Sequence, residues 1–186
     1  MKRFFDVVMS AFLLCLLSLP MLIVAMLVKL TSAGPILYRS TRAGINNSLF
    51  QMPKFRTMRR DSPVVATHLL ENPRLYLTPI GSFLRKFSLD ELPQLFSILK
   101  GNMSFVGPRP ALYNQDDLID LRAKKGIHAL TPGITGWAQV NGRDDLSIPE
   151  KVAYDEYYVK NKSFLMDMKI LWMTFAKVVK AEGVKH

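Results

Sequence analysis

An uncharged apolar run near the N-terminus is the feature that most constrains this chain. The segment from Val7 to Val28 holds roughly 22 residues, and none of them is charged. A helix of about 20 apolar residues crosses about 30 Å of hydrocarbon, so this run is long enough for a membrane anchor. No small-residue cleavage site follows it. We therefore expect a retained anchor rather than a removed signal peptide.

Pro20 lies in the middle of this run and interrupts the helical pattern. Proline removes a backbone hydrogen bond, and the hydroxyl of nearby Ser18 is a suitable donor to a freed carbonyl. Positive charge flanks both ends of the run, with Lys2 and Arg3 before it and Lys29, Arg39 and Arg42 after it. Because positive residues favour the cytoplasmic side, this symmetry favours a helix that bends at Pro20 and returns to the same face. A proline-kinked spanning helix is the alternative.

Composition predicts one domain with an anionic partner. The 186 residues have room for one sizeable core, and the net charge is +10. That charge suits nucleic acid, an anionic membrane surface or a phosphate-rich substrate, and a basic solvated surface is the simpler explanation. Cys15 is the only cysteine, which excludes disulfides and cysteine-based zinc sites. The three histidines are too scattered to indicate a metal cluster.

Two adjacent carboxylates, Asp90 and Glu91, stand among apolar residues at a predicted helix start. Ser88 and Glu91 have the spacing of a capping box, in which serine and glutamate satisfy free backbone N–H groups. The alternative is chemical, because such N–H groups and the helix dipole also hold a carboxylate ionised and attract phosphate. An ionised Asp90 would then serve as a nucleophile or a metal ligand. These residues alone do not separate the two interpretations.

The rest of the pattern predicts helices and one hairpin. Strands are expected at 35–39 and 49–52, around a turn at 44–47. Residues 61–78 contain prolines and weak periodicity, so we expect a loop there. Helices are predicted at 78–87, 88–100, 114–125 (facing solvent), 147–161 and 164–181. The last of these helices is mostly apolar, so it either packs in the core or lies in a membrane interface.

Cations and glycines in three loops are candidates for binding an anion. Residues 54–60 alternate cations with apolar residues, which suits a solvated strand edge or an anion-facing one. Arg109 stands between two prolines that stiffen its loop, as a phosphate clamp requires, and an ordinary surface arginine is the alternative. Segment 131–143 combines three glycines with Trp137 and Arg143. Glycine-rich loops let backbone N–H groups approach phosphate.

Six motifs follow one another along the chain. They are KFRTM (54–58), SLDELPQL (88–95), KGNMSFVGPRP (100–110), PGITGWAQVNGR (132–143), YDEYYVKN (154–161) and SFLMDMKI (163–170). Their content and order resemble the monotopic phosphoglycosyl transferases, the bacterial sugar transferase family, over almost the whole chain. The resemblance implies an α+β, mostly helical fold. It would combine a re-entrant, proline-broken membrane helix (1–30) with a cytoplasmic-face catalytic domain (31–186), in which a small β-hairpin and amphipathic interfacial helices surround the active site.

The resemblance also implies an enzyme at the cytoplasmic face of the bacterial inner membrane. Such enzymes use Mg²⁺ and transfer a phospho-sugar from a nucleotide diphosphate sugar, usually a UDP-sugar, to a polyprenyl phosphate such as undecaprenyl phosphate. The products are UMP and a polyprenyl-diphosphate sugar, which begins the assembly of a glycoconjugate such as O-antigen, capsule, exopolysaccharide or a glycoprotein glycan. The implied partners are these two substrates and anionic inner-membrane lipids, without nucleic acid, and a homodimer is left open.

Site residues follow from the resemblance, motif by motif. Asp90 is the implied nucleophile, and Asp90 with Glu91 would hold the metal. The positions that would bind the phosphates or the nucleotide sugar are Lys54, Arg56, Arg109, Arg143 and Asp167. Ser18 and Pro20 fall on the break of the membrane helix, with one residue between them where the family has an adjacent pair. Two alternatives stay open: a membrane-anchored aspartyl-phosphate hydrolase, and a non-catalytic scaffold that binds anionic lipid.

Overall fold

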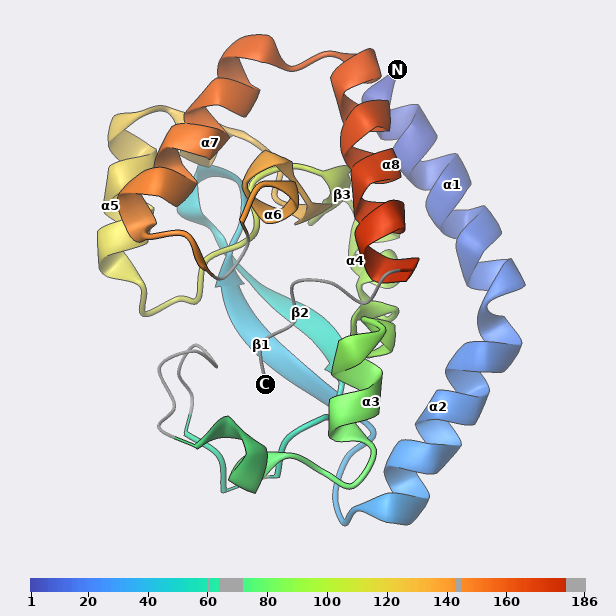
Figure 1. The fold of residues 1–186 in the computed structure, drawn as a ribbon. Helices are drawn as coiled ribbons and strands as arrows, with labels where there is room; N and C mark the ends of the chain where they lie inside the picture. Colours follow the sequence, from blue (N-terminus) through green and yellow to red (C-terminus); the bar gives the residue numbers. More distant parts are fainter. Residues whose placement is uncertain (60, 64–71, 143–144, 180–186) are drawn as a thin grey trace.

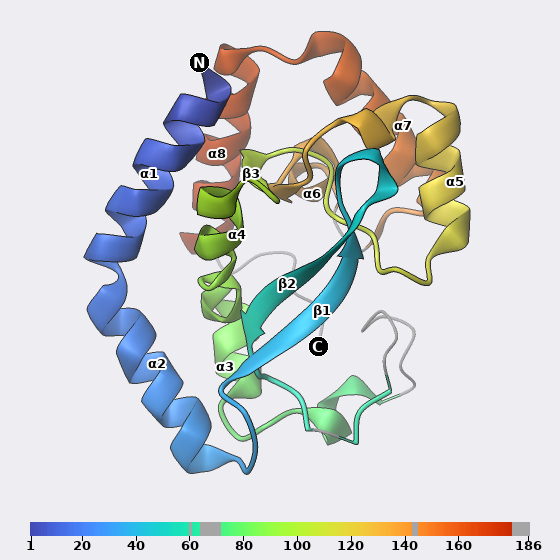
Figure 2. The same ribbon diagram turned by 180° about the vertical axis from the view of Figure 1, so that it is seen from behind.

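The computed structural model describes residues 1–59, 61–63, 72–142 and 145–179, and its fold is the predicted mostly helical α+β fold. Its helices are α1 (Lys2–Leu16), α2 (Ser18–Thr31), α3 (Gly81–Lys86), α4 (Gln94–Lys100), α5 (Asp116–Lys124), α6 (Trp137–Val140), α7 (Ile148–Asn161) and α8 (Phe164–Val179). Its strands are β1 (Leu37–Ala43), β2 (Leu49–Phe55), β3 (Ser104–Val106) and β4 (Gly133–Thr135). Helices α1 and α2 run along one side of the molecule, and α5 lies on the opposite side (Figures 1 and 2).

Helices α1 and α2 form a bent pair, which confirms the predicted break in the apolar run. They meet at Leu17 with a bend of 63°, three residues before the predicted bend at Pro20. The hydroxyl of Ser18 donates to the carbonyl of Cys15 at 2.8 Å and so satisfies a carbonyl near the break. Pro20 lies in the first turn of α2, where a missing N–H costs no helical hydrogen bond. No single helix among the described residues is long and apolar enough to cross a membrane, but this pair together meets that test.

The outer face of the bent pair is apolar and exposed. Its exposed residues are Phe4, Val8, Phe12, Leu16, Leu19, Leu22, Ile23, Met26 and Leu30. The inner face packs on the rest of the fold, with Leu13 against the core around Ile98, and Val28 beside Leu84. An exposed apolar surface of this extent indicates contact with a membrane or with a partner.

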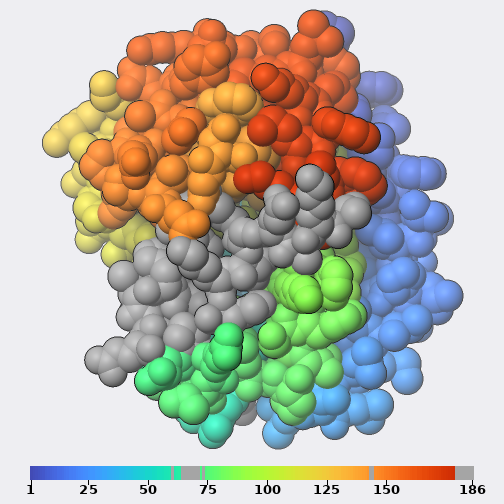
Figure 3. Space-filling model, viewed as in Figure 1, coloured from blue at the N-terminus to red at the C-terminus, as the bar shows by residue number. Residues whose placement is uncertain are grey.

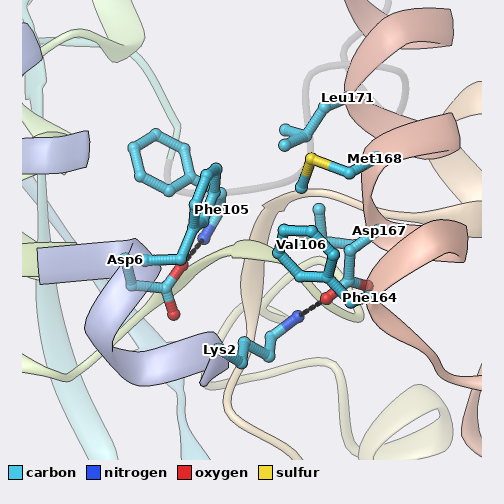
Figure 4. A pocket seen from close by; sticks show the side chains of 9 residues that line it. Lys2, Asp6, Phe105, Val106, Phe164, Asp167, Met168 and Leu171 are labelled. Atoms are coloured by element: carbon cyan, nitrogen blue, oxygen red, sulfur yellow. Dashed lines mark hydrogen bonds and ion pairs between the residues drawn. The ribbon is translucent and has the colours of Figure 1, made fainter. Parts of the chain in front are cut away.

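Polar contacts attach the N-terminal end of α1 to β3, α7 and α8. Lys2 forms an ion pair of 2.5 Å with Asp167 and donates to the hydroxyl of Tyr158 at 3.0 Å. Figure 4 shows Lys2 reaching Asp167 across the small pocket that these residues line with Asp6 and Phe105. The buried carboxylate of Asp6 accepts a hydrogen bond from the backbone N–H of Phe105 at 3.1 Å.

The C-terminal end of α2 is held by Arg56, the residue after β2. Its guanidinium donates to the carbonyls of Ser32 at 2.8 Å and Ala33 at 2.5 Å, and to the Ser32 hydroxyl at 2.8 Å. These are carbonyls just beyond a helix end, which lack partners in the helix itself. Both ends of the bent pair are therefore fixed to the same folded body.

The predicted hairpin is confirmed and is longer than expected. Strands β1 and β2 pair antiparallel, with Leu37 opposite Phe55 and Ala43 opposite Leu49. Lys54 thus belongs to β2 rather than to a separate segment. Because side chains alternate along a strand, Phe55 packs under the sheet near Leu84 while Lys54 faces the other way.

A second, unpredicted sheet joins β3 and β4 in parallel, with Ser104 opposite Gly133. The expectation of a phosphate-approaching glycine loop is wrong for Gly133 and Gly136. A Cβ atom added to Gly133 would lie 2.2 Å from the backbone nitrogen of Gly107, and one added to Gly136 would lie 2.1 Å from the carbonyl oxygen of Gly107. These glycines permit two backbone segments to approach each other closely.

Several helix boundaries differ from the prediction. Helix α3 begins at Gly81, because Thr78 turns its hydroxyl to the carbonyl of Thr57 at 3.4 Å instead of capping a helix. Helix α5 is not purely solvent-facing, since its Arg122 is buried. The predicted capping box at the start of α7 is confirmed. The expected loop 61–78 contains a short 3-10 turn, Pro73–Tyr76, and its residues 64–71 lie outside the described residues, as do the last residues of the expected C-terminal helix.

Exposed aromatic side chains lie on α3 and α8. Figure 3 shows these two helices on the same face of the molecule, with α1 and α2 along its edge. Trp172 and Phe175 on α8 are 70% and 61% exposed, and Phe83 on α3 is 58% exposed. Aromatic rings in such positions are typical of a membrane interface.

Candidate active site

The carboxylate of Glu91 binds two cations from distant parts of the chain. Nζ of Lys54 lies 2.9 Å from Oε1 of Glu91, and Nη2 of Arg109 lies 2.6 Å from the same oxygen. The side chains of Glu91 and Lys54 are 12% and 17% exposed, so water screens their attraction only weakly. The fold thus brings three of the predicted site residues into one cluster.

These contacts keep Glu91 ionised. Burial raises the pKa of Glu91, but Arg109 and Lys54 together lower it more, so its pKa lies well below the usual range for glutamate. Burial lowers the pKa of Lys54, and the charge of Glu91 opposes that change. Glu91 therefore acts as the counter-ion that permits two cations to lie in a poorly hydrated site.

Asp90 is buried beside Glu91 but has no hydrogen-bond partner among the residues that the structure describes. Its exposed fraction is 6%. Burial raises the pKa of Asp90, Lys54 lowers it and Glu91 raises it, and the net pKa lies above the usual range. A carboxylate that accepts no hydrogen bond keeps its lone pairs for an incoming group. Asp90 thus has the environment of a nucleophile or a metal ligand, whereas Glu91 organises the cations.

The backbone at Ser88 presents the two carboxylates. Ser88 has a left-handed conformation with φ of 54°, and a 3-10 turn, Leu89–Glu91, follows it. The Ser88 side chain makes no capping hydrogen bond, and α4 begins only at Gln94. The capping-box interpretation of Ser88 and Glu91 is therefore wrong, because the Glu91 carboxylate is bound by Lys54 and Arg109 instead. Left-handed non-glycine residues are strained, and such strain is often found at functional sites.

The other end of α4 is bound by α1. Both terminal nitrogens of the Arg3 guanidinium donate to the last turn of α4, to the carbonyls of Ile98 at 2.6 Å and Leu99 at 2.8 Å. A cation favours the C-terminal end of a helix and satisfies carbonyls that lack helical partners. The helix ends as predicted at Gly101, which has a left-handed φ of 93°.

Four consecutive carbonyls fix the loop that carries Arg109. Each accepts a hydrogen bond of 2.7 to 3.1 Å: Pro108 from Gly133, Arg109 from Arg122, Pro110 from Arg42 and Ala111 from Ala43. The donors belong to β4, α5 and β1. This loop is therefore held by three separate elements, in addition to the two prolines that stiffen it.

Two further arginines, Arg85 and Arg42, lie close to the carboxylates, and no sequence pattern marks either of them as a site residue. Arg85 on α3 lowers the pKa of Asp90 through its charge, and its Nε donates to the Thr57 hydroxyl at 2.9 Å. Burial and the charge of Arg109 lower the pKa of Arg42 to about 10, while Glu91 raises it. From the sequence alone, Arg42 is only one of several positive charges that follow the apolar run, so nothing marks it as a site residue. Only the register of the hairpin brings it beside Arg109.

Two predicted binding residues lie away from this cluster in the described contacts. Arg56 binds the end of α2, and Asp167 is bound by Lys2 and Tyr158. Both lie away from the carboxylates for the same physical reason, because each binds one end of the bent helix pair. Arg143 lies outside the described residues. A phosphate-binding role for these three residues stays a prediction.

A magnesium site would need the substrate. Within the described part of the chain, no group of three or more His, Cys, Asp or Glu side chains is placed to hold a metal ion. Mg²⁺ in proteins is usually bound by one or two carboxylates together with substrate phosphates. Asp90, with its unused lone pairs beside Glu91, fits that pattern.

Comparison with known proteins identifies the family of the chain. The family model described as "Bacterial sugar transferase" matches residues 1–181. The chain belongs to the bacterial sugar transferase family. This is the family that the six motifs of this sugar transferase imply. Two of its relatives are named as transferases that act on undecaprenyl phosphate.

Three similar proteins illustrate the range of this sugar transferase family. The uncharacterized sugar transferase EpsL of Bacillus subtilis (strain 168) is 41% identical over 100% of this chain and 91% of EpsL. The exopolysaccharide production protein ExoY of Sinorhizobium fredii is 39% identical, over 98% of this chain and 87% of ExoY. The UDP-glucose:undecaprenyl-phosphate glucose-1-phosphate transferase of Escherichia coli (strain K12) is 39% identical over 95% of this chain, which spans 40% of that longer protein.

We predict opposite stability effects for the two carboxylates. Glu91→Gln leaves buried cations without their counter-ion, so the free energy of unfolding should fall by about 3 kcal/mol. Asp90→Asn removes a buried charge that accepts no hydrogen bond, so the free energy of unfolding should stay the same or rise. Thermal unfolding in detergent without substrate or magnesium measures both. An equal loss in the two variants would show that Asp90 also has a structural partner.

Proposed function

We propose that this sugar transferase moves a sugar 1-phosphate from a UDP-sugar to undecaprenyl phosphate and releases UMP. The observation that carries this proposal is the difference between the carboxylates: Asp90 has no hydrogen-bond partner in the described residues, while Glu91 is bound by Lys54 and Arg109. The substrate classes are those named for two relatives, one acting on UDP-glucose and one on UDP-N-acetylgalactosamine. The names of the ExoY relatives support exopolysaccharide as a product pathway.

The reaction proceeds in two displacements at one phosphorus atom. A carboxylate oxygen of Asp90 attacks the sugar-bearing phosphorus, and the bond from that phosphorus to the bridging oxygen breaks. UMP leaves with the bonding electrons. A phosphate oxygen of undecaprenyl phosphate then attacks the same phosphorus and breaks the bond to Asp90, which restores the carboxylate. A covalent intermediate lets a soluble and a lipid substrate use one site in turn.

The charges around the site favour this reaction. Lys54, Arg109, Arg42 and Arg85 outnumber the two carboxylates by two positive charges. The pyrophosphate of a UDP-sugar carries two negative charges, so the site and the substrate are complementary. Arg109 presents a planar fork to phosphate oxygens, and cations fixed in advance stabilise the charge that develops on the departing UMP.

Magnesium fits the same site. Carboxylate oxygens of Asp90 and Glu91 would hold it together with the substrate phosphates. When bound, it would neutralise pyrophosphate charge that otherwise repels a carboxylate nucleophile.

We predict that turnover requires both undecaprenyl phosphate and the charge of Asp90. A panel of radiolabelled UDP-sugars, incubated with the purified protein in lipid nanodiscs and Mg²⁺, should deliver label to the organic phase only when undecaprenyl phosphate is present. Asp90→Asn should abolish this transfer because it keeps the shape and removes the attacking charge. Asp120→Asn, a change at an exposed aspartate of α5, is the matched control and should keep full activity.

Three outcomes would contradict the proposal. Label released into water as sugar phosphate would indicate the aspartyl-phosphate hydrolase. No turnover with any UDP-sugar would favour the non-catalytic scaffold. Near wild-type transfer by Asp90→Asn would exclude Asp90 as the nucleophile.

We also infer that the bent helix pair enters the inner membrane and returns to its cytoplasmic face. Lys2 and the end of α2 are both fixed to the same folded body, by Asp167 and by Arg56. A spanning helix would instead separate its ends by about 30 Å of hydrocarbon. The exposed apolar outer face, together with the 63° bend, suits a hairpin that lies partly within one leaflet.

Thiol labelling in cells tests this topology. In a Cys15→Ala background, two variants are made. One has a single cysteine inserted directly after Met1, and the other has a single cysteine in place of Lys29, which is exposed on α2. We expect both cysteines to resist a membrane-impermeant thiol reagent in intact cells and to react once the cells are opened. Labelling of the N-terminal cysteine in intact cells would establish a conventional span.

A further inference from the structure

We propose that Arg122 is a positioning residue for the phosphate-binding arginine of this site. Arg122 lies on α5 and its partner Asp155 lies on α7, outside the carboxylate cluster. The inference rests on the proposed function in one respect, because it takes Arg109 as a ligand of the nucleotide diphosphate. In this proposal, the buried pair of Arg122 and Asp155 fixes the position of Arg109.

The guanidinium of Arg122 uses two of its edges. Nε and Nη2 donate to Oδ2 of Asp155 at 3.0 and 2.6 Å, and Nη1 donates to the backbone carbonyl of Arg109 at 2.7 Å. Arg122 is 9% exposed and Asp155 is 1% exposed. A planar guanidinium holds several donors in a rigid fork, so fixing one edge on Asp155 fixes the direction of the other.

The contact links α7 to the catalytic carboxylates in a short series. Asp155 orients Arg122, Arg122 binds the carbonyl of Arg109, and the side chain of Arg109 binds Glu91. A shift of the Arg109 backbone would therefore move the guanidinium that faces the substrate. Misplacement of a binding group by about 1 Å is enough to reduce activity strongly.

The packing of α5 on α7 does not depend on this pair alone. Leu118 of α5 and Val152 of α7 belong to one apolar cluster, and Lys125 and Glu156 form a second ion pair of 3.2 Å. Buried ion pairs are often no more stabilising than apolar residues of similar volume. The feature that distinguishes Arg122 from these other contacts is its hydrogen bond to Arg109.

The test replaces both members of the pair, so that no buried charge is left alone. Arg122→Met/Asp155→Leu should unfold within a few degrees of the parent protein, because apolar substitution of both partners is often neutral. Affinity for UDP with Mg²⁺, measured by calorimetry in nanodiscs, should fall about tenfold, as expected when a charged hydrogen-bond donor is lost. The matched control, Lys125→Met/Glu156→Leu, removes the ion pair that joins the residue after α5 to α7 and should leave UDP affinity unchanged.

Arg122→Lys keeps the inference testable if the double variant is unstable. It retains a cation beside Asp155, but one ammonium cannot reproduce the fork that binds Asp155 and the Arg109 carbonyl together. We expect a folded protein with UDP affinity reduced several-fold. Wild-type affinity in a folded Arg122→Lys and in a folded double variant would overturn the inference.

A double-mutant cycle shows whether Arg122 acts through Arg109. In an Arg109→Ala background, adding Arg122→Met/Asp155→Leu should weaken UDP binding by less than about twofold, because the group that it positions is already absent. Equal weakening in both backgrounds would mean a general structural effect and would overturn the inference. Failure of the wild-type protein to bind UDP at all would overturn the proposed function and this inference with it.

Discussion

The paired contacts of Glu91 with Lys54 and Arg109 are the interaction on which the rest of the candidate site depends. They join β2, the turn after α3 and the loop after β3, three segments far apart in the chain. Each of these charges would be costly to bury alone. Together they form a stable cluster, and Asp90 beside it is left without a hydrogen-bond partner among the described residues. The same arrangement that stabilises the cluster therefore leaves the carboxylate of Asp90 available to an incoming group.

The bent helix pair and the candidate site form one unit. Helix α4 follows the carboxylates, and its last carbonyls are bound by Arg3 of α1. Lys2 and Arg56 attach the two ends of the bent pair to the same body. A movement of α1 would therefore be transmitted through α4 to the turn that carries the carboxylates. The bent helix pair therefore has a fixed position relative to the carboxylates.

The sequence predicted those features that depend on local pattern. The apolar run, its break, the hairpin and the stiff Arg109 loop follow from charge, proline and periodicity within short segments. Local pattern also made candidates of Asp90, Glu91, Arg109 and the cations of 54–60, and motif resemblance gave them their roles. The rest depends on contacts between distant segments. Strand β3 pairs with β4, with Ser104 opposite Gly133 and Val106 opposite Thr135. Arg42 and Arg122 contact the Arg109 loop only because of hairpin register and helix packing. The left-handed backbone of Ser88 could not be predicted from the sequence. Ser88 and Glu91 have the spacing of a capping box, which predicts a regular helix start at this point.

The most direct test of the account is the mass of the intact protein during the first half-reaction. The purified sugar transferase is mixed with an accepted UDP-sugar and Mg²⁺ without undecaprenyl phosphate, quenched in acid and measured by mass spectrometry. The account predicts an increase equal to one sugar phosphate less one water, located on the peptide that contains Asp90 and lost when undecaprenyl phosphate is added before the quench. An unmodified Asp90 in samples that turn over when the lipid is supplied would contradict it.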